Sequence, residues 1–334
     1  MSATTTMQAV VLNAFGEPMT LSNIPRPAAG PGQVLVRILA SGVNPLDIKI
    51  AAGQAAHARP VLPAVLGIDL AGVVEAVGPG VTAFKIGDEV YGMAGGIGGV
   101  QGSLAQFSAV DADLLAIKPS NISMREAAAL PLVFITAWEG LVDRAHLSVD
   151  KTVLVHGGAG GVGHIAVQIA VAAGARVFAT GTAEQKEIIE SYGATAIDYV
   201  STTVEEYVEQ HTGGEGFDLI YDTVGGATLD ASFRAARQYH GHVVSCLGWG
   251  THALAPLSFR AATYSGVFTL LPLLSGKGRA QHGAIMREAT GLVEAGKVRV
   301  NLDPSTYSIN TVAAAHSAII HGTATGKIVV DIDQ

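Results

Sequence analysis

Short apolar runs separated by glycine and proline turns fill the first third of the chain. Turn signals such as Pro79-Gly80 and Gly87-Asp88 punctuate them, and the runs themselves are residues 8–12, 33–38, 70–77 and 89–91. Many short strands with this punctuation are typical of a β-rich barrel or sandwich. We therefore expect a β-rich domain from residue 7 to about residue 125.

From Ser123 the hydrophobic pattern changes to alternating helices and strands. Ser123 followed by Glu126 is a capping-box pattern that begins a helix, and Pro131 should interrupt it. Further on, β-branched runs alternate with helical segments: strands at 152–156, 176–180, 195–197, 217–222 and 242–247, and helices at 184–192, 204–211 and 227–239. This alternation predicts βαβ units in a doubly wound parallel sheet, which is the α/β fold class.

The C-terminal segment continues the alternation with a helix at 280–295, a strand at 298–302, a helix at 312–321 and a strand at 327–332. A chain of 334 residues is long for a single hydrophobic core. Two domains are therefore expected.

A glycine turn follows the strand at 152–156. Gly158, Gly160 and Gly163 fit the G-x-G-x-x-G pattern, and an apolar helix without proline follows. The first glycine permits the tight turn, the second lets a pyrophosphate approach the backbone, and the third lets helix and strand pack closely. Because strand and helix flank the turn as a dinucleotide site requires, we predict that it binds a dinucleotide through free N–H groups, with Gly161 and Val162 taking part.

The end of the next strand indicates which dinucleotide is bound. An acidic residue there would bond the ribose 2′-hydroxyl of NAD, but the strand ends near Thr182 with no carboxylate before Glu184. Thr180, Thr182 and Lys186 offer two hydroxyls and a cation that suit a 2′-phosphate. The alternative is that Lys186 is an ordinary solvated helix lysine. The sequence favours NADPH over NADH.

Composition and charge exclude several classes of protein. Hydrophobic residues make up 49% of the chain and charged residues 14%, which is typical of a well-buried globular protein. The 20 Lys and Arg against 28 Asp and Glu give a formal charge of −8 without a basic cluster, so no nucleic-acid partner is expected. The single cysteine, Cys246, excludes an intrachain disulfide framework and fits a cytoplasmic protein. Neither a signal peptide in residues 1–6 nor a membrane span is expected.

Five sequence motifs lie along the chain: Gly42–Lys49, Leu66–Val74, Phe84–Tyr91, Gly157–Gly163 and Asp222–Gly226. Together they resemble the medium-chain dehydrogenase/reductase superfamily, specifically its zinc-independent quinone oxidoreductase and enone reductase branch. The resemblance covers nearly the whole chain. It implies a GroES-like catalytic domain of residues 1–127 and 275–334, a Rossmann domain of residues 128–274, and an active cleft between them.

The resemblance also bears on metal binding. Zinc-dependent relatives place a cysteine ligand where this chain has Asn44, and a His-Glu pair where it has Ile68-Asp69. A catalytic zinc normally takes three protein ligands of the Cys, His or carboxylate type. We therefore expect no metal, and direct hydride transfer from a nicotinamide to the substrate.

Asn44 and Lys49 are the candidate catalytic residues. The Asn-Pro-x-Asp-x-Lys form is similar to that of plant-type enone reductases, and this likeness implies a lysine near the nicotinamide or the substrate oxygen. Lys49 either polarises or protonates that oxygen, or forms a salt bridge with Asp47 or another carboxylate. Asn44 either bonds the substrate carbonyl or the nicotinamide ribose, or only forms the turn before Pro45.

The same resemblance implies further cofactor contacts. Thr136 is expected on the nicotinamide side and Tyr199 on the adenosine side, and the backbone around Val224, Cys246 and Leu247 is expected at the ribose or carboxamide. Cys246 itself is expected to be an inert, packed thiol. Dimers are usual in the family, so a homodimer that pairs through Val267–Leu271 is expected.

The function that follows is an NADPH-dependent reductase of a quinone or an α,β-unsaturated carbonyl. Two alternatives stay open: an enoyl-thioester reductase, and a cofactor-binding protein with little catalysis, as in the crystallin relatives. The substrate pocket is expected to draw its walls from the loops 51–63, 92–102 and 248–276. The segment 92–102 holds six glycines and is predicted to be a mobile loop, either a lid or a plain surface loop.

Overall fold

The computed structural model describes residues 5–332 and divides into two compact units. The first comprises the residues up to Leu132, Leu270–Gly296 and the residues from Val300 on, and the second comprises Val133–Thr269 and Lys297–Arg299. Residues 1–4, part of the segment expected to lack a signal peptide, and residues 333–334 of the expected domain 275–334 lie outside the described residues.

Two sheets form most of the first unit. Their strands are β1 Thr6–Leu12, β2 Thr20–Pro25, β3 Gln33–Gly42, β4 Ala64–Val65, β5 Asp69–Val77, β6 Glu89–Met93, β7 Phe107–Asp111, β8 Leu115–Ile117, β15 Tyr307–Ser308 and β16 Val329–Asp331. One sheet has the order β2-β1-β4, and the other has the order β15-β16-β3-β5-β6-β8 with β7 also paired to β3. Neighbouring strands are antiparallel except β15 and β16. This is the predicted β-rich domain.

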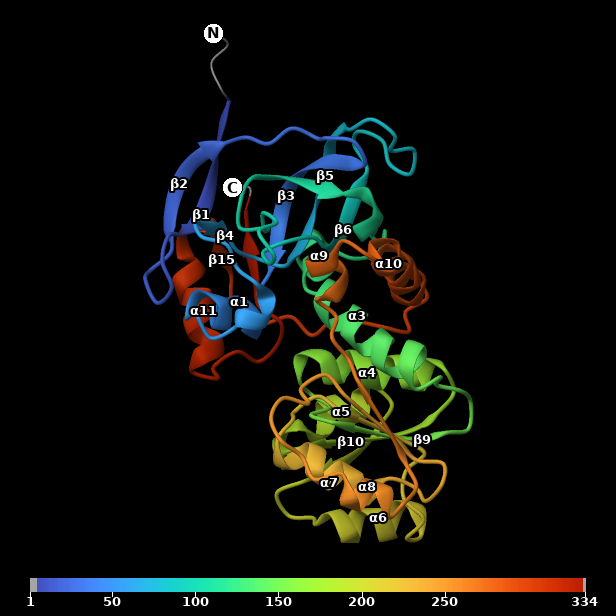
Figure 1. The fold of residues 1–334 in the computed structure, drawn as a ribbon. Coiled ribbons are helices and arrows are strands. Elements are labelled where there is room, and N and C mark those ends of the chain that lie inside the picture. Colours follow the sequence, from blue (N-terminus) through green and yellow to red (C-terminus); the bar gives the residue numbers. More distant parts are fainter. Residues whose placement is uncertain (1–4, 333–334) are drawn as a thin grey trace. The chain divides into compact units, whose positions relative to one another are not determined.

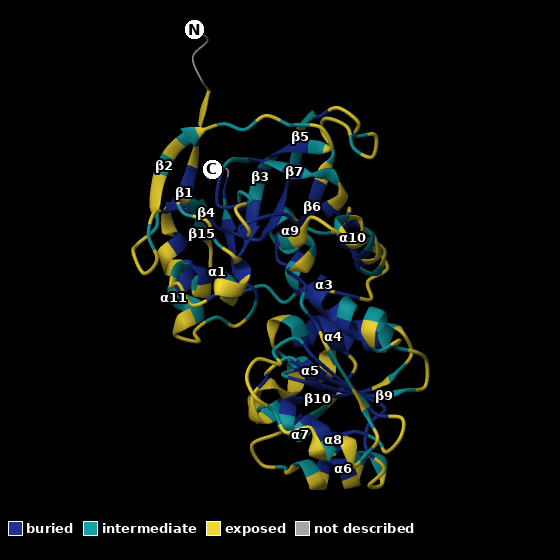
Figure 2. Ribbon diagram, in the orientation of Figure 1, coloured by how far each residue is buried: buried dark blue, intermediate teal, exposed yellow. Residues whose placement is uncertain are grey.

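Strand β3 is the centre of the larger sheet because it pairs with β5, β7 and β16. Its register against β5 shifts at two places, between Leu35 and Val36 and between Ile38 and Ala40. Such irregularities bend a sheet and increase its twist. Figure 2 shows β3, β5 and β6 largely buried, so they supply the core of this unit.

Short helices flank these sheets: α1 Pro45–Ala51, η1 Ala56–Ala58, η2 Ala112–Leu114, α2 Met124–Ala128, α9 Leu271–Ser275, α10 Arg279–Glu294, η5 Ile309–Thr311 and α11 Val312–Ile320. Ser123 and Glu126 form the predicted capping box at the start of α2. The long helix α10 packs on β6 and β8, where the buried Tyr91 donates a hydrogen bond to the carbonyl of Met286 at 2.9 Å.

One parallel sheet organises the second unit. Its strands are β9 Thr152–His156, β10 Arg176–Gly181, β11 Thr195–Asp198, β12 Leu219–Asp222, β13 His242–Ser245 and β14 Thr263–Gly266. They lie in the order β11-β10-β9-β12-β13-β14. Numbered from β9, this is the 3-2-1-4-5-6 order of a Rossmann sheet, so the predicted fold class is confirmed. The order in which successive strands are added reverses beside β9. Ligands of such folds bind at that point, beyond the carboxyl ends of the strands.

Helices cover both faces of this sheet: α3 Pro131–Trp138, the π-helical η3 Glu139–Arg144, α4 Gly161–Ala172, η4 Ala183–Gln185, α5 Lys186–Ser191, α6 Val204–Thr212, α7 Ala227–Ala235 and α8 Ala255–Ser258. Figure 1 shows α4 and α5 on one face and α6 and α7 on the other. Between the sheet and the helices α6 and α7 lies an apolar core that includes Leu154, Phe217 and Phe233. Within residues 5–332, no helix combines the length and the apolar character that crossing a membrane requires.

The structure departs from the prediction at Pro131 and at residues 298–302. Pro131 separates two helices as predicted, but it also begins the second, α3. Proline suits this first helical position because its missing N–H would be unpaired there in any case. Residues 298–302 form no strand, contrary to the prediction, since the side chain of Gln168 bonds both the N–H and the carbonyl of Arg299 at 2.9 Å and takes the place of a neighbouring strand.

The glycine-rich segment 92–102 is buried over residues 92–97 and exposed at Gly98 and Gly99. Gly92 ends β6 together with Met93, and residues 94–97 are buried. Backbone hydrogen bonds fix the segment, from Ala94 to Ile68 at 2.8 Å and from Gly98 to Ala58 at 2.9 Å. Its glycines permit close packing of backbone on backbone: a Cβ at Gly95 would lie 2.0 Å from the carbonyl oxygen of Gln101.

Candidate active site

The glycine turn lies between β9 and α4, at the carboxyl edge of the parallel sheet. Gly157 takes the left-handed conformation of the turn, with φ +72°, so the residue that needs this freedom is Gly157 and not Gly158 as predicted. Gly158 instead packs on β10, where a Cβ would lie 2.5 Å from the Cβ of Ala179. Gly163 has its predicted packing role, because a Cβ there would lie 2.0 Å from the carbonyl oxygen of Gly157.

The start of α4 presents polar backbone at this edge. Gly160 and Gly161 are exposed. Within residues 5–332, the N–H groups of Gly161, Val162 and Gly163 have no hydrogen-bond acceptor in the protein. Free N–H groups and the positive end of a twelve-residue helix form a place for an anion. The turn therefore fits the pyrophosphate of a dinucleotide.

The residues expected at the adenosine end fall into two groups. Thr182, Lys186 and Tyr199 follow the adjacent strands β10 and β11, and the N–H of Tyr199 bonds the carbonyl of Gly181 at 3.2 Å. Lys186 is exposed and lies 3.9 Å from Glu190. Thr180 is buried, and its hydroxyl oxygen accepts the N–H of Gly157 at 3.1 Å. Thr180 thus holds the glycine turn and does not present its hydroxyl at the surface.

His156, which precedes the turn, shares this local network. Its Nδ1 lies 3.2 Å from the hydroxyl oxygen of Thr180, and the hydroxyl of Thr223 donates to its carbonyl at 2.6 Å. Burial lowers the pKa of the ring to about 4, although Asp222 acts in the opposite direction. The ring is therefore neutral near pH 7 and serves to pack the turn.

Asp222 connects two further loops at the same edge. One of its carboxylate oxygens accepts the N–H groups of Val224 and Gly225 at 3.1 and 2.9 Å, and the other accepts the hydroxyl of Ser245 at 2.7 Å. The Ser245 oxygen in turn accepts the N–H of Leu247 at 3.0 Å. Asp222 is fully buried. Its carboxylate thereby fixes the backbone at two of the three predicted contacts, Val224 and Leu247.

Thr136 lies buried in α3, where Tyr221 donates its hydroxyl to the carbonyl of Thr136 at 2.6 Å. Tyr221 and Asp222 are consecutive at the end of β12, so one strand end supports both α3 and the loops after β12 and β13. Cys246 follows β13, and burial raises the pKa of its thiol to about 12. The thiol stays protonated, which agrees with the expected inert role and excludes a thiolate nucleophile at neutral pH.

In the first unit, Asn44 is the N-cap of α1 and lies in a buried polar network. Lys327 donates to the amide oxygen of Asn44 at 2.6 Å and to the carbonyl of Val43 at 3.0 Å. The amide nitrogen of Asn44 donates to Asp69 at 2.9 Å. Asp47 accepts the N–H of Asn44 at 2.8 Å. The Asn44 side chain thus points into the protein, and two of its hydrogen-bonding positions are occupied.

Burial changes the ionisation of this network. Burial raises the pKa of Asp47 from 3.8 to about 7 and that of Asp69 from 3.8 to about 6, even though Lys327 favours both carboxylates. Burial lowers the pKa of Lys327, and the two carboxyl groups oppose that shift. One oxygen of Asp47 is buried without a hydrogen-bond partner in the described chain. Two carboxyl groups therefore share a single buried cation.

Lys49 lies on the opposite, exposed side of α1. Asp47 is buried, and the cation that acts on it is Lys327, so the alternative of a Lys49–Asp47 salt bridge is not realised. Within residues 5–332, Lys49 has no ion-pair partner. Its ammonium is available to a ligand.

Asn44 and Asp69 occupy two positions at which zinc-dependent relatives are expected to carry ligands. Here the two side chains bond each other directly. Across the described part of the chain, no three His, Cys, Asp or Glu side chains come together in a group that could hold a metal ion.

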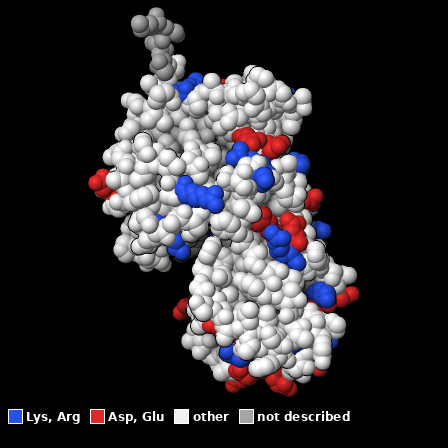
Figure 3. Space-filling model, viewed as in Figure 1, with Lys and Arg blue, Asp and Glu red and all other residues white. Residues whose placement is uncertain are grey.

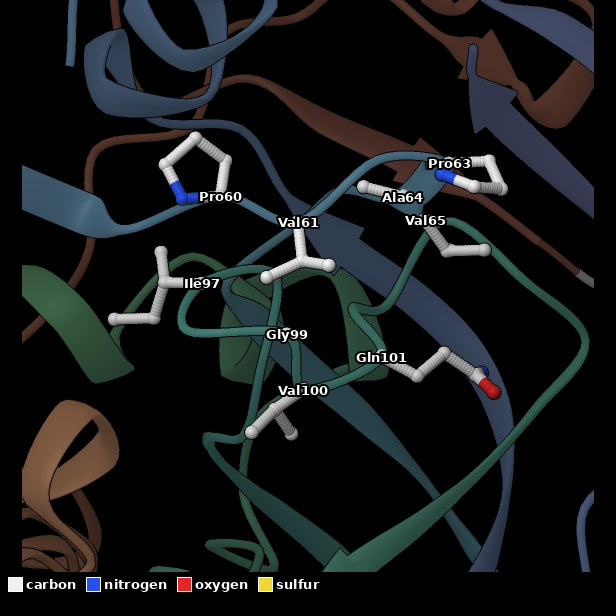
Figure 4. A pocket seen from close by; sticks show the side chains of 10 residues that line it. Pro60, Val61, Pro63, Ala64, Val65, Ile97, Gly99, Val100 and Gln101 are labelled. Atoms are coloured by element: carbon white, nitrogen blue, oxygen red, sulfur yellow. The ribbon is translucent and has the colours of Figure 1, made fainter. Parts of the chain in front are cut away.

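A small cavity of about 170 Å³ lies in the first unit, between the segments 60–65 and 96–101. Figure 4 shows Val61 above Gly99, with Ile97 to one side and Val100 below. Gln101 supplies the one polar side chain among the residues that line the cavity. Two of the three loops expected to form substrate walls, 51–63 and 92–102, thus meet in one place.

The sequence interpretation missed Lys327 and the roles of Tyr221 and Ser245. Lys327 precedes an apolar run and carries no motif, so only its contact with Asn44, 283 positions away, reveals it. Asp222 opens the motif Asp222–Gly226, and the structure specifies which loops its carboxylate holds.

Two family models match the chain. One, described as the alcohol dehydrogenase GroES-like domain, matches residues 30–120, and the other, described as zinc-binding dehydrogenase, matches residues 192–330.

Three curated relatives align with most of the chain. A 2-methylene-furan-3-one reductase of Solanum lycopersicum is 37% identical, over 92% of this chain and 74% of that protein. An NADPH-dependent alkenal/one oxidoreductase, chloroplastic, of Arabidopsis thaliana is 36% identical over the same shares. A quinone oxidoreductase of Pongo abelii is 32% identical over 97% of both chains.

Solved structures are also similar. An alcohol dehydrogenase superfamily protein from Novosphingobium aromaticivorans is 56% identical with a TM-score of 0.96, over 98% of this chain and 100% of that one. The CurK enoyl reductase is 26% identical with a TM-score of 0.85, over 98% and 99% of the two chains.

Proposed function

The chain belongs to the zinc-independent quinone oxidoreductase and enone reductase branch of the medium-chain dehydrogenase/reductase superfamily, and from this premise we propose that it is an NADPH-dependent reductase of α,β-unsaturated carbonyls or quinones that works without a metal. We propose that residues 128–274 bind the cofactor. Residues 1–127 and 275–334 then supply the side chains that act on the substrate.

One observation carries the cofactor part of the proposal. At the point where the strand order reverses, the sheet presents a glycine turn whose helix N–H groups have no acceptor within residues 5–332. Thr182 and Lys186 follow the neighbouring strand, and the exposed Lys186 is free to move from Glu190 to a 2′-phosphate. The Arabidopsis relative is named as NADPH-dependent, which supports the same choice.

The proposed reaction balances with one hydride and one proton. A reduced nicotinamide dinucleotide held at the glycine turn would supply a hydride, and the β-carbon of the enone would take it as a new C–H bond. The π electrons of the C=C bond shift toward the carbonyl oxygen, and the α-carbon then takes a proton. A quinone takes the hydride and one proton to give a hydroquinone. Each turnover consumes one NADPH and one proton.

Lys49 is proposed to stabilise the oxygen on which negative charge develops. It is exposed, and in the described chain it has no carboxylate partner. A cation close to a developing oxyanion lowers the barrier most when it needs no rearrangement during the reaction. Asn44, whose amide faces inward, is proposed to hold the start of α1 and so the place of Lys49.

An enoyl thioester is the second candidate substrate, because CurK, an enoyl reductase, has a similar fold over nearly the whole chain. A cofactor-binding protein with little catalysis is the third. A homodimer is also proposed, since β14 is an edge strand of the parallel sheet and Val267–Leu271 follow it. The reducing cytoplasm is proposed from the single cysteine.

An acceptor panel tests the proposal. NADPH or NADH consumption is measured with a small enone, a quinone and an enoyl-CoA. We expect turnover of the enone or quinone with NADPH preferred over NADH, and Lys49→Met should lower kcat by about a hundredfold because it removes one oxyanion donor. The control is Lys85→Met, at another exposed lysine of the first unit, which should leave kcat unchanged.

Two results would overturn parts of this proposal. Tight NADPH binding without turnover of any acceptor leaves only the cofactor-binding protein. Equal kcat values for Lys49→Met and the wild type remove the proposed role of Lys49.

A further inference from the structure

Lys327 supplies the one cation of a buried cluster in the first unit that otherwise holds two carboxyl groups and an amide. Lys327 is 7% exposed, Asp47 1%, and both Asn44 and Asp69 0%. The members come from separate parts of the chain: α1 and its N-cap, the first residue of β5, and the segment before β16. An ammonium group buried at this depth requires hydrogen-bond acceptors and nearby negative charge, since removing it from water is costly.

Two backbone hydrogen bonds hold Lys327 in place. Its N–H bonds the carbonyl of Asn301 at 2.7 Å, and its carbonyl accepts the N–H of Asp303 at 3.0 Å. From this anchored position the ammonium reaches the carbonyl of Val43 and the amide oxygen of Asn44. The C-terminal segment is thus hydrogen-bonded to the N-cap residue of α1.

The contact decides which way the Asn44 amide faces. A lysine ammonium can only donate, so the amide must turn its oxygen to Lys327 and its nitrogen to Asp69. Asp69 uses its other oxygen to accept the N–H of Leu132 at 2.9 Å, in the first turn of α3. A continuous chain of hydrogen bonds therefore runs from Lys327 through Asn44 and Asp69 to the start of α3.

Two proposed functional residues depend on the helices at the ends of this chain. Lys49 lies on α1, whose N-cap residue Asn44 is joined to the first turn by its N–H bond to the Asp47 carboxylate. Thr136 lies on α3, whose first turn Asp69 holds. We propose that Lys327 is a positioning residue of the reductase, which sets the Asn44 amide and through it the starts of α1 and α3. This inference rests on the proposed function for its catalytic consequence. Its structural consequence stands independently of that function.

The charge balance supports this role. Without the ammonium, the amide of Asn44 could turn over, and two buried carboxyl groups would face each other with no cation. The raised pKa values of Asp47 and Asp69 indicate that even one cation does not fully compensate them. Loss of Lys327 therefore should affect both the order of the helix starts and the stability of the unit.

The chain offers a matched control in Lys118. It is equally buried at 7% exposure and donates to the carbonyls of Pro119 and Ile122 at 2.8 and 2.7 Å. Its ionic partner is Glu89 at 3.2 Å, and it has no contact with Asn44 or Asp69. Lys118→Met thus removes a buried ammonium from the same unit without touching the proposed chain of contacts.

The test compares Lys327→Met, Lys327→Arg and Lys118→Met with the wild type. We measure kcat and KM for the enone, the dissociation constant for NADPH, the melting temperature, and hydrogen–deuterium exchange of the unliganded protein. Lys327→Met should lower kcat by about tenfold to a hundredfold, a loss typical of small misplacement at a catalytic site, and leave the NADPH constant within about twofold. Exchange should accelerate in residues 45–51 and 131–138, and Lys327→Arg should restore part of kcat.

Lys118→Met should keep kcat within about twofold of the wild type, whatever it does to the melting temperature. If Lys327→Met folds poorly, the double variant Lys327→Met/Asp69→Asn removes one of the two carboxyl groups left without a cation. We expect it to recover melting temperature but not kcat.

The proposal is overturned if the Lys327 and Lys118 variants show the same relation between the loss of kcat and the loss of melting temperature. It is also overturned if the double variant recovers both quantities, or if exchange at 45–51 and 131–138 is unchanged. A wild-type protein without turnover would contradict the proposed function, while the exchange data would still decide whether Lys327 orders the two helix starts.

Discussion

Burial decides what each polar side chain of the site can do. Thr180 and Thr182 are two positions apart, but the buried hydroxyl of Thr180 bonds the glycine turn, whereas Thr182 follows the end of β10 and is half-exposed. Asn44 and Lys49 differ in the same way across one short helix. The sequence names these residue types, and burial separates those that support the site from those that can meet a ligand.

Asp47 allows a test of the buried cluster by pH. Its pKa is raised in the folded protein, so between pH 3.8 and about 7 the folded chain binds more protons than the unfolded chain. The free energy of unfolding should therefore fall as pH rises through this interval. Asp47→Asn keeps an acceptor for the N–H of Asn44 but cannot ionise, so its free energy of unfolding should fall less over the same pH interval. The difference from the wild type should be up to a few kcal/mol, at about 1.4 kcal/mol per pKa unit.

Urea unfolding at about pH 5 and pH 8 measures this difference. Asp113→Asn, at an exposed carboxyl group of η2, is the control and should keep the wild-type slope. An Asp47→Asn protein with the wild-type pH dependence would show that this carboxyl group does not titrate between folded and unfolded states as the structure implies.

Among the elements, the β9–turn–α4 unit depends on the absence of a side chain at Gly163. Gly163→Ala would place a Cβ 2.0 Å from the carbonyl oxygen of Gly157, which backbone movement must relieve. We expect a loss of stability of about 1–3 kcal/mol and at least about tenfold weaker NADPH binding, because the turn that should hold the pyrophosphate shifts.

Gly291→Ala is the matched control for this change. Gly291 lies inside α10 and has no atom within 4 Å of a built Cβ. Alanine there should increase stability by about 0.5–1 kcal/mol and leave NADPH binding unchanged. Thermal unfolding and cofactor titration measure both variants, and equal effects at the two positions would contradict the packing argument.

Elements with a local cause could be predicted from sequence, and those with a distant cause could not. The capping box at Ser123 and the strand–turn–helix around Gly158 follow from neighbouring residues. Residues 298–302 have the composition of a strand, yet Gln168 occupies the backbone of Arg299. Lys327 meets Asn44 only through the fold. The motifs therefore predicted where the site lies, and the fold revealed what holds it.

For the whole molecule, each unit carries one half of the proposed chemistry. The parallel sheet offers the glycine turn and the Asp222 loops, and the β-rich unit offers Lys49 and the buried cluster behind it. Figure 3 shows acidic and basic side chains mixed on the face drawn. With a formal charge of −8, this distribution favours a small-molecule substrate over nucleic acid.

The most direct measurement follows the hydride itself. NADPH that carries deuterium at C4 is consumed with a small enone, with and without a metal chelator, and the product is analysed by NMR. We expect deuterium at the β-carbon of a saturated ketone and equal rates with and without the chelator. Deuterium at the carbonyl carbon of an alcohol, or a rate that the chelator abolishes, would contradict a metal-independent reductase of activated alkenes.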